Sequence, residues 1–249
     1  MHRREFTKGM LATITGIAFL DTLFRQQLFA SPVRSIADAW LKELHERCSD
    51  LRTAKLLPVE WQAEINRLHR RLPLEDLLKL IDFEKAVENF EYPDLGVVTA
   101  NPQLPKLEGV ERYSFYGRIF GMQQDRAIIP HGHKNMTSCH RVLKGEFLLR
   151  QYDRLHDDGD YMVIRQTIEQ KALPGSFSSI SDDQNNIHWL VAETPRAFTF
   201  DVIVPDYNDK PTEIDNIDIY EGTKTPEGDL RVKKLRVQEA LEKYGKTHH

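Results

Sequence analysis

The character of the sequence changes at Gly109, and this change limits the possible folds more than any other feature. After it, short apolar runs follow one another, and Gly, Pro, Asn and Asp residues cluster between them. The runs cover residues 113–122, 127–133, 140–152, 161–168, 187–193, 197–204 and 217–220. Many short strands separated by turns are typical of a β-sandwich or a small barrel rather than of a parallel α/β sheet.

The segment 35–92 has a different pattern. Its apolar residues recur every three or four positions, and Pro58 and Pro73 each begin a new segment. We therefore expect a helical lead-in over 35–92 that packs on a barrel over 109–222. A C-terminal extension over 223–249 follows, with a short surface helix near residues 235–244.

Residues 1–30 look like an export signal. Arg3 and Arg4 precede a mildly apolar stretch over residues 9–20, and small residues follow at 30–31. The adjacent arginines resemble the twin-arginine type of signal, which carries folded proteins across a membrane. We expect a periplasmic or otherwise exported protein. The alternative is an amphipathic N-terminal helix on a cytoplasmic protein.

Composition excludes several classes of function. The formal net charge of -4 offers no general reason to expect nucleic-acid binding, which needs a concentrated basic face. After the N-terminal segment, no run reaches the roughly 18 apolar residues of a stable membrane span. Two cysteines, Cys48 and Cys139, are too few for a disulfide framework or a Cys-rich zinc site. Ten histidines are more informative, because imidazole is the commonest metal ligand.

His131 and His133 end one of the strand-like runs. Residues two apart in a strand project to the same side, so both imidazoles can face one point. Two neutral imidazoles suit Zn, Cu, Fe or Ni better than Mg or Ca, which prefer oxygen ligands. The pair is accompanied by Gly145, twelve residues after His133, and by a later His188.

These features together resemble the two-part signature of the cupins, which are small double-sheet β-barrels. The resemblance implies that His131, His133 and His188 meet inside the barrel and hold one metal ion. In the usual cupin signature, three or four residues separate the second histidine from a glutamate. Thr137 and Ser138 occupy those positions here, and an all-histidine triad distinguishes the thiol dioxygenases from most cupins.

The match becomes more specific over residues 130–207. The run His131-Gly132-His133-Lys134-Asn135-Met136-Thr137 is similar to the plant cysteine oxidases and to cysteamine dioxygenase, and so is Asn186-Ile187-His188. The resemblance extends more loosely over residues 36–220. It implies Fe(II)-dependent addition of both atoms of O₂ to the sulfur of a thiol, giving a sulfinate. The substrate would be cysteine, cysteamine or a peptide with an N-terminal Cys.

Two alternatives stay open at this point. Cupins host isomerases, hydrolases and other oxygenases, so the same metal site can serve a different reaction. The chain can also be a non-catalytic exported module that binds a metal or a small ligand. The sequence leaves the oligomeric state undetermined.

Four further residues are candidates for the active site. Asp201 matches an acidic residue of the family and is expected to orient water or substrate, unless it only bonds backbone at a strand end. Strand alternation puts His140 on the inward side, where it could be a fourth ligand, a proton donor, a partner of a ligand or a hydrogen-bonded core residue. Arg118 is a candidate for binding a substrate carboxylate and Tyr207 for supplying a pocket hydroxyl. Cys139 has the opposite parity and is expected to face away. The cysteine dioxygenases of animals carry a cysteine near this point that crosslinks to a tyrosine, but the register here is off by one, so we predict no such crosslink.

Overall fold

The computed structural model describes residues 36–208 and 210–246. The signal-like segment 1–30 lies outside the described residues, so the predicted export signal stays a prediction. Within the described part of the chain, no helix is both long enough and apolar enough to span a bilayer.

Helices form the first part of the chain, as predicted. A helix over residues 36–52 is followed by α2 (Pro58–Arg71), α3 (Leu74–Leu80) and α4 (Phe83–Val87). Pro58 occupies the first turn of α2, where its missing N–H costs nothing, and the Glu60 carboxylate accepts the Leu57 N–H at 2.8 Å. The buried residues Trp61, Ile65 and Leu68 share one face of this helix.

Two antiparallel sheets make up the rest of the molecule. A five-stranded sheet has the order β1-β2-β9-β4-β7, and the other strands close into the ring β10-β11-β6-β5-β8-β3. The strands are β1 (Val98–Ala100), β2 (Tyr116–Met122), β3 (Ala127–Lys134), β4 (Met136–Lys144), β5 (Phe147–Asp158), β6 (Tyr161–Ala172), β7 (Phe177–Ile180), β8 (Ile187–Ala192), β9 (Ala197–Pro205), β10 (Glu213–Lys224) and β11 (Leu230–Leu235). The chain ends in helix α5 (Val237–Tyr244).

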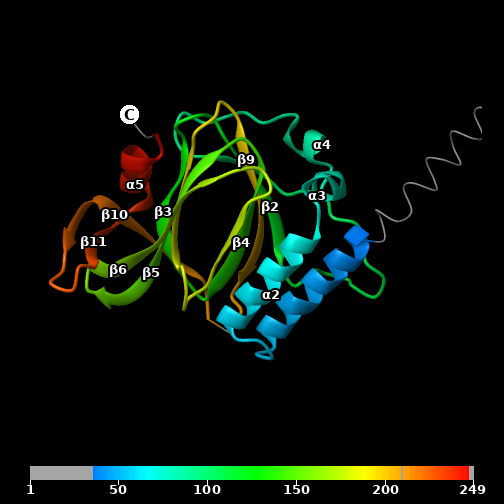
Figure 1. Cartoon of the computed structure of the whole chain (residues 1–249), viewed down its shortest axis with the longest axis horizontal. Coiled ribbons are helices and arrows are strands. Elements are labelled where there is room, and N and C mark those ends of the chain that lie inside the picture. The colour runs from blue at the N-terminus through cyan, green and yellow to red at the C-terminus, as the bar shows by residue number, and fades with distance from the viewer. Residues whose placement is uncertain (1–35, 209, 247–249) are drawn as a thin grey trace, which may run out of the picture.

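The two sheets face each other across an apolar core. Met122 and Val142 project into it from the five-stranded sheet, and Phe147, Leu149 and Leu190 come from the other sheet. This is the predicted mainly β, double-sheet barrel with a helical segment before it, and the prediction of fold class is confirmed (Figure 1).

The helices cover the outer face of the five-stranded sheet (Figure 1). Phe198, Phe200 and Val202 of β9 alternate outward into a cluster with Trp61 and Ile65 of α2. The residues between them on β9 therefore point inward, toward the opposite sheet. This alternation determines which polar residues of the strand reach the interior of the barrel.

The strands differ from the sequence-based expectation in two places within the barrel. The run 140–152 forms parts of two strands, because Gly145 makes the turn between them with a positive φ of 76°. A Cβ at Gly145 would lie 2.6 Å from the Thr194 hydroxyl, so the turn requires glycine. The serine-rich strand β7 lacked an apolar pattern and was missed.

The sheets also extend beyond the expected bounds of 109–222. β1 precedes them, and β11 lies within the expected C-terminal extension, where it closes the ring between β10 and β6. β11 is rich in charged residues and buries Val232, so its sequence did not reveal it as a strand. Helix α5 packs beside β3 and β10, where the Tyr244 hydroxyl donates to Asp218 at 2.7 Å.

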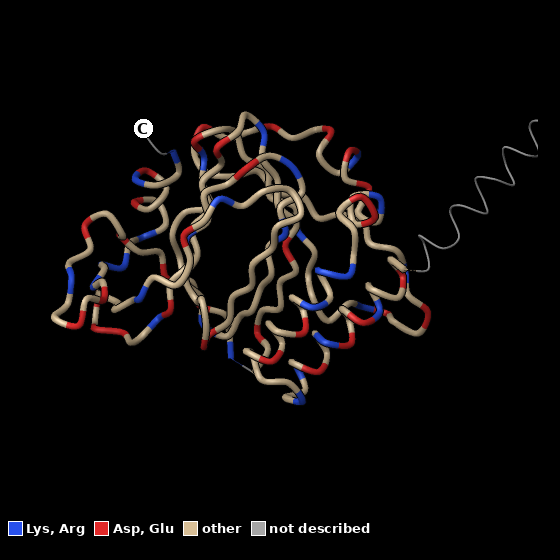
Figure 2. Tube along the Cα trace, in the orientation of Figure 1, with Lys and Arg blue, Asp and Glu red and all other residues tan. Residues whose placement is uncertain are grey.

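Charges of both signs are interspersed along the surface elements, whereas the strands at the centre of the barrel carry few (Figure 2). Several charges form a network where β3, β5 and β10 meet. Arg154 bonds Asp157 at 2.5 Å and Asp215 at 2.6 Å, and Lys134 lies 3.3 Å from Asp157. The network ties the ends of these strands together.

His69 of α2 predicts a pH dependence of stability. Burial and the nearby Arg141 cation lower the pKa of His69 to about 3, and neither ring nitrogen has a hydrogen-bond partner. Below pH 6.5 the His69 imidazole binds a proton in the unfolded chain but stays neutral in the folded chain, so acid favours unfolding. Between pH 7.5 and 5, His69→Phe should reduce the loss of unfolding free energy by about 2 kcal/mol.

Urea unfolding of metal-free protein at both pH values measures this difference. Phe conserves the ring contacts with Trp40 and Phe177. Replacement of the exposed His156 by Phe is the control and should leave the pH dependence of the wild type unchanged. Equal acid sensitivity in His69→Phe and the wild type would contradict the assignment.

Candidate metal centre

Three histidines converge on the inner face of the second sheet. His131 and His133 lie on β3, and His188 lies directly opposite His131 on β8. One ligand atom from each histidine lies within 4.8 Å of the others, and no other group of three His, Cys, Asp or Glu side chains gathers in this way within residues 36–208 and 210–246. The ring centroids of His131 and His188 are 4.2 Å apart, and those of His131 and His133 are 4.7 Å apart.

Local features of β3 produce this arrangement. The ladder between β3 and β8 is irregular between Ile128 and His131, and such bulges redirect side chains next to active sites. Gly132 leaves room for Asn186, since a Cβ there would lie 2.7 Å from the Asn186 Oδ1. The Asn186 amide donates to the His133 carbonyl at 2.7 Å and to the Ser181 carbonyl at 3.0 Å. Asn186 thus links both strands that carry the triad.

The three imidazoles are neutral near pH 7. Burial lowers the pKa of His131 to about 4 and holds the pKa of His133 and of His188 well below the usual value. Neutral imidazole has the lone pair that a metal ligand needs. The Nδ1 of His131 lies 2.7 Å from the Ile129 carbonyl, to which it donates, so Nε2 is left for a metal.

The remaining nitrogens provide a test of whether these residues fit a metal ion. Both ring nitrogens of His133 and the Nδ1 of His188 are buried without a hydrogen-bond partner. A buried polar atom without a partner is unfavourable, and a bound ion would satisfy nitrogens that the protein leaves unpaired. The three histidines therefore fit one transition-metal ion, and an all-nitrogen set disfavours Mg or Ca.

The donor group contains no carboxylate. By strand alternation Ser138 faces inward with His140, and its hydroxyl lies 3.3 Å from the His140 Nε2. Thr137 has the opposite parity. The structure thus has a hydroxyl on the inner face where the usual cupin signature has a glutamate.

His140 and Asp201 form a buried pair beside the triad. They are cross-strand partners on β4 and β9, and His140 Nδ1 lies 2.5 Å from the Asp201 Oδ2. The His140 ring centroid is 4.6 Å from that of His188. Since Asp201 occupies Nδ1, His140 stands next to the three-histidine group rather than within it. The second oxygen of Asp201, Oδ1, is buried without a partner.

Arg118 and Tyr207 have other partners. Arg118 pairs in register with Asp201 across β2 and β9, but its Nε donates to the Asn101 side chain at 3.2 Å. The Tyr207 hydroxyl donates to Asp182 at 3.0 Å, and the same carboxylate accepts the Asn135 N–H at 2.7 Å. Tyr207 thus belongs to a hydrogen-bonded group at the turn between β3 and β4, and its pKa is raised by burial and by Asp182.

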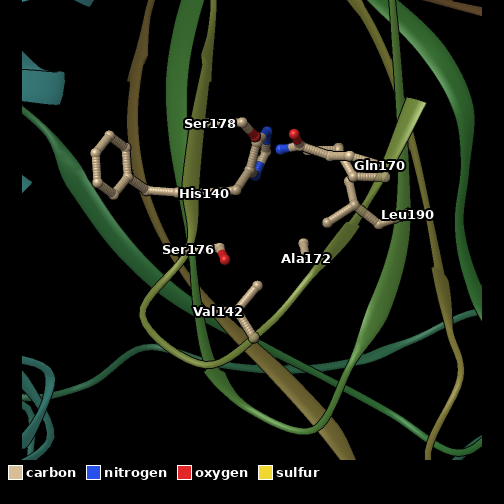
Figure 3. A pocket seen from close by; sticks show the side chains of 9 residues that line it. His140, Val142, Gln170, Ala172, Ser176, Ser178 and Leu190 are labelled. Carbon is tan, nitrogen blue, oxygen red and sulfur yellow. The ribbon is translucent and has the colours of Figure 1, made fainter. Parts of the chain in front are cut away.

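A narrow cavity lies beside His140. Its walls are mainly apolar, and Figure 3 shows the polar ends of Ser178 and Gln170 turned toward the His140 ring. The lining residues are His140, Val142, Leu149, Gln170, Ala172, Ser176, Phe177, Ser178 and Leu190. The sequence reading missed this cavity, because β7, which supplies two of its residues, carries no apolar pattern.

The sequence reading also missed Gln151, which lies opposite His188 on β5. One signal was present in the sequence. Phe147 and Leu149 occupy the preceding inward positions of this strand, so alternation predicts an apolar residue at position 151. The sequence has a glutamine there instead.

Three solved structures each align with about half of this chain. Procruciferin, the 11S globulin of Brassica napus, aligns with 51% of this chain at 14% identity and a TM-score of 0.35. A cupin superfamily protein of Desulfitobacterium hafniense aligns with 47% at 12% identity and a TM-score of 0.31. A protein of Klebsiella pneumoniae with a double-stranded β-helix domain aligns with 52% at 12% identity and a TM-score of 0.36.

The two facing sheets of this chain form a double-sheet β-barrel. The matched regions cover 84% and 92% of the two bacterial chains. The chain spans only 29% of the length of procruciferin. No protein-family model matches the sequence, and no curated protein matches it.

Loss of one histidine of the triad should weaken metal binding. His188→Ala should remove one of the three ligands and reduce the metal content of purified protein by a factor of about ten or more. Metal analysis of protein purified with Fe(II) or Zn(II) measures the content. His156→Ala removes an exposed histidine and serves as the control. Full metal content in His188→Ala would show that the ion binds elsewhere.

Proposed function

We propose that this protein is a mononuclear non-haem iron thiol dioxygenase, which converts a thiol and O₂ into a sulfinate. The observation that carries the proposal is the all-imidazole donor group, with Ser138 instead of a carboxylate on the inner face. The substrate class is a small thiol such as cysteine or cysteamine, or an N-terminal cysteine of a peptide. The cofactor is Fe(II).

The charge of the ligand set favours an anionic substrate. Three neutral imidazoles leave the 2+ charge of an ion uncompensated, whereas two imidazoles and a carboxylate would reduce it by one. A thiolate supplies the missing negative charge and prefers such an electropositive site. Bound Fe(II) would supply the redox chemistry that joins O₂ to sulfur. Both oxygen atoms end on the sulfur, which provides all four electrons, so no external reductant is needed.

The pair of His140 and Asp201 is the polar group that we expect to act on the substrate. Asp201 accepts the hydrogen of the His140 Nδ1 and thereby determines the tautomer and the orientation of the ring. The Nε2 of His140 then accepts a hydrogen bond, from the Ser138 hydroxyl in the free protein and from substrate in the complex. The narrow cavity in Figure 3 adjoins this ring.

Arg118 and Tyr207 remain part of the proposal in lesser roles. Arg118 lies next to Asp201 in register, so it is the cation that we expect a substrate carboxylate to attract. Tyr207 would support the turn between β3 and β4 through Asp182 rather than contact substrate.

Oxygen consumption tests this function. Anaerobically purified Fe(II) protein should consume O₂ with cysteine, cysteamine or a peptide with an N-terminal Cys, and mass spectrometry should show a product heavier by two oxygen atoms. His188→Ala should abolish the consumption, whereas His156→Ala should retain it. Product labelled from ¹⁸O₂ should contain both labelled atoms.

Two results would reject the proposal. The first is a protein that binds zinc and gains no thiol-dependent O₂ consumption when loaded with iron. The second is O₂ consumption that persists unchanged in His188→Ala. Either would favour a different reaction of the same barrel, such as isomerisation or hydrolysis, or a binding role without catalysis.

We also propose that residues 1–30 direct export to the periplasm, on the pattern of Arg3, Arg4 and the apolar stretch that follows. Replacement of both arginines by lysine should retain the protein in the cytoplasm, because twin-arginine recognition depends on the pair. Cell fractionation measures the distribution. Equal periplasmic amounts of the double variant and the wild type would refute this route.

A further inference from the structure

Gln151 is buried next to the metal centre without a partner. Its side chain is fully buried, and neither Nε2 nor Oε1 of its amide has a hydrogen-bond partner within the described part of the chain. Buried amides are normally paired, because a dry donor or acceptor is destabilising. Gln62 is also buried and its Oε1 is unpaired, but its Nε2 donates to the Ser179 carbonyl at 3.0 Å. The unpaired amide of Gln151 therefore requires an explanation.

The strand register places Gln151 in line with the triad. Gln151 on β5 is the direct partner of His188 on β8, which is in turn the direct partner of His131 on β3. Direct cross-strand partners project to the same face, with Cβ atoms about 5 Å apart. The three side chains thus form one row on the inner face of the sheet. Phe147 and Leu149 precede Gln151 in the inward series of β5 and line the core.

The row differs in exposure along its length. Gln151 and His188 are buried, whereas His131 is half-buried and so is Asn216, its partner on β10. Gln151 thus lies at the closed end of the centre, away from its more open side. A molecule that binds the ion from the open side and fills the site would meet the amide at the bottom.

The ladder around Gln151 is also irregular. The pairing of β5 with β6 shifts register between Gln151 and Tyr152, whereas the pairing of β5 with β8 runs without a shift. Such irregularities are frequent next to active sites, where they redirect a side chain. A second irregularity lies in β3 just before His131, so both ends of the row are adjusted.

The chemistry of the surroundings selects the ligand. A 2+ ion on three neutral imidazoles attracts an anion, and the neutral amide can donate to an anion without changing the charge. Asp201 is engaged with His140 and supplies an acceptor rather than a donor. We propose that the Gln151 Nε2 donates a hydrogen bond to a small anion, such as a thiolate, held beside His188. The identity of that anion as a thiolate rests on the proposed function, whereas the contact itself does not.

Azide titration of the Co(II)-loaded protein tests the contact. Azide is a small anion, and its binding to cobalt changes the visible absorption. Gln151→Met should weaken azide affinity about tenfold or more, because a hydrogen bond to a charged group is lost. The melting temperature of the metal-free variant should equal or exceed that of the wild type, because methionine has similar volume and needs no partner.

Gln62→Met is the matched control. It removes a buried amide whose Nε2 has a partner, and this amide lies on α2 rather than on a strand that carries the triad, so the change should lower the melting temperature and leave azide affinity unchanged. Gln151→Asn keeps the amide but withdraws it by one methylene, so it should also weaken azide binding. It provides a second test at this position if Gln151→Met does not fold. A change of less than twofold in both Gln151 variants, or no azide binding by the wild type, would overturn the proposal.

Titration with cysteamine without oxygen, and O₂ consumption with it, separate the two proposals. An azide affinity that changes in the Gln151 variants, together with no O₂ consumption when thiols are added, would keep the anion contact and reject the thiol dioxygenase. Thiol oxidation, together with an azide affinity that does not change in the Gln151 variants, would keep the thiol dioxygenase and reject the anion contact. A drop in melting temperature as large as that of Gln62→Met would reveal a structural partner and overturn the contact.

Discussion

The antiparallel pairing of β3 with β8 is the constraint on which the metal centre depends. It makes His131 and His188 direct partners, and their ring centroids lie 4.2 Å apart because both side chains leave the sheet on one face. His133, two residues further along, adds the third imidazole by alternation. Gly132 admits the Asn186 side chain, which bonds the His133 carbonyl and links the two strands. Backbone pairing thus assembles the donors before any ion binds.

Burial then determines what these donors can do. Removal from water lowers the pKa of all three imidazoles, so their nitrogens are free to bind a metal at neutral pH. The same dry surroundings strengthen each polar interaction in the wall, including the 2.5 Å contact of His140 with Asp201. They also make the unpaired amide of Gln151 costly. A site of this kind gains most from a ligand that brings negative charge and accepts hydrogen bonds.

The helices have an indirect but necessary part in this arrangement. They provide the apolar surface against which Phe198, Phe200 and Val202 of β9 pack. Because successive residues of a strand alternate, burying these side chains outward forces Asp201 inward, opposite His140. A slip of one residue would place the carboxylate among apolar helix residues. Packing on the outer face of the sheet therefore holds the polar pair on the inner face.

The sequence by itself determined the class of fold and part of the centre. Short apolar runs between turn residues predicted a double-sheet barrel, and period-two spacing put His131 and His133 on one side of a strand. Only the tertiary structure decided that Asp201 bonds His140, that Tyr207 bonds Asp182, and that Gln151 stands opposite His188. The reason is physical. Side-chain alternation is a local property of the chain, whereas cross-strand partners depend on which distant strands become neighbours and in which register.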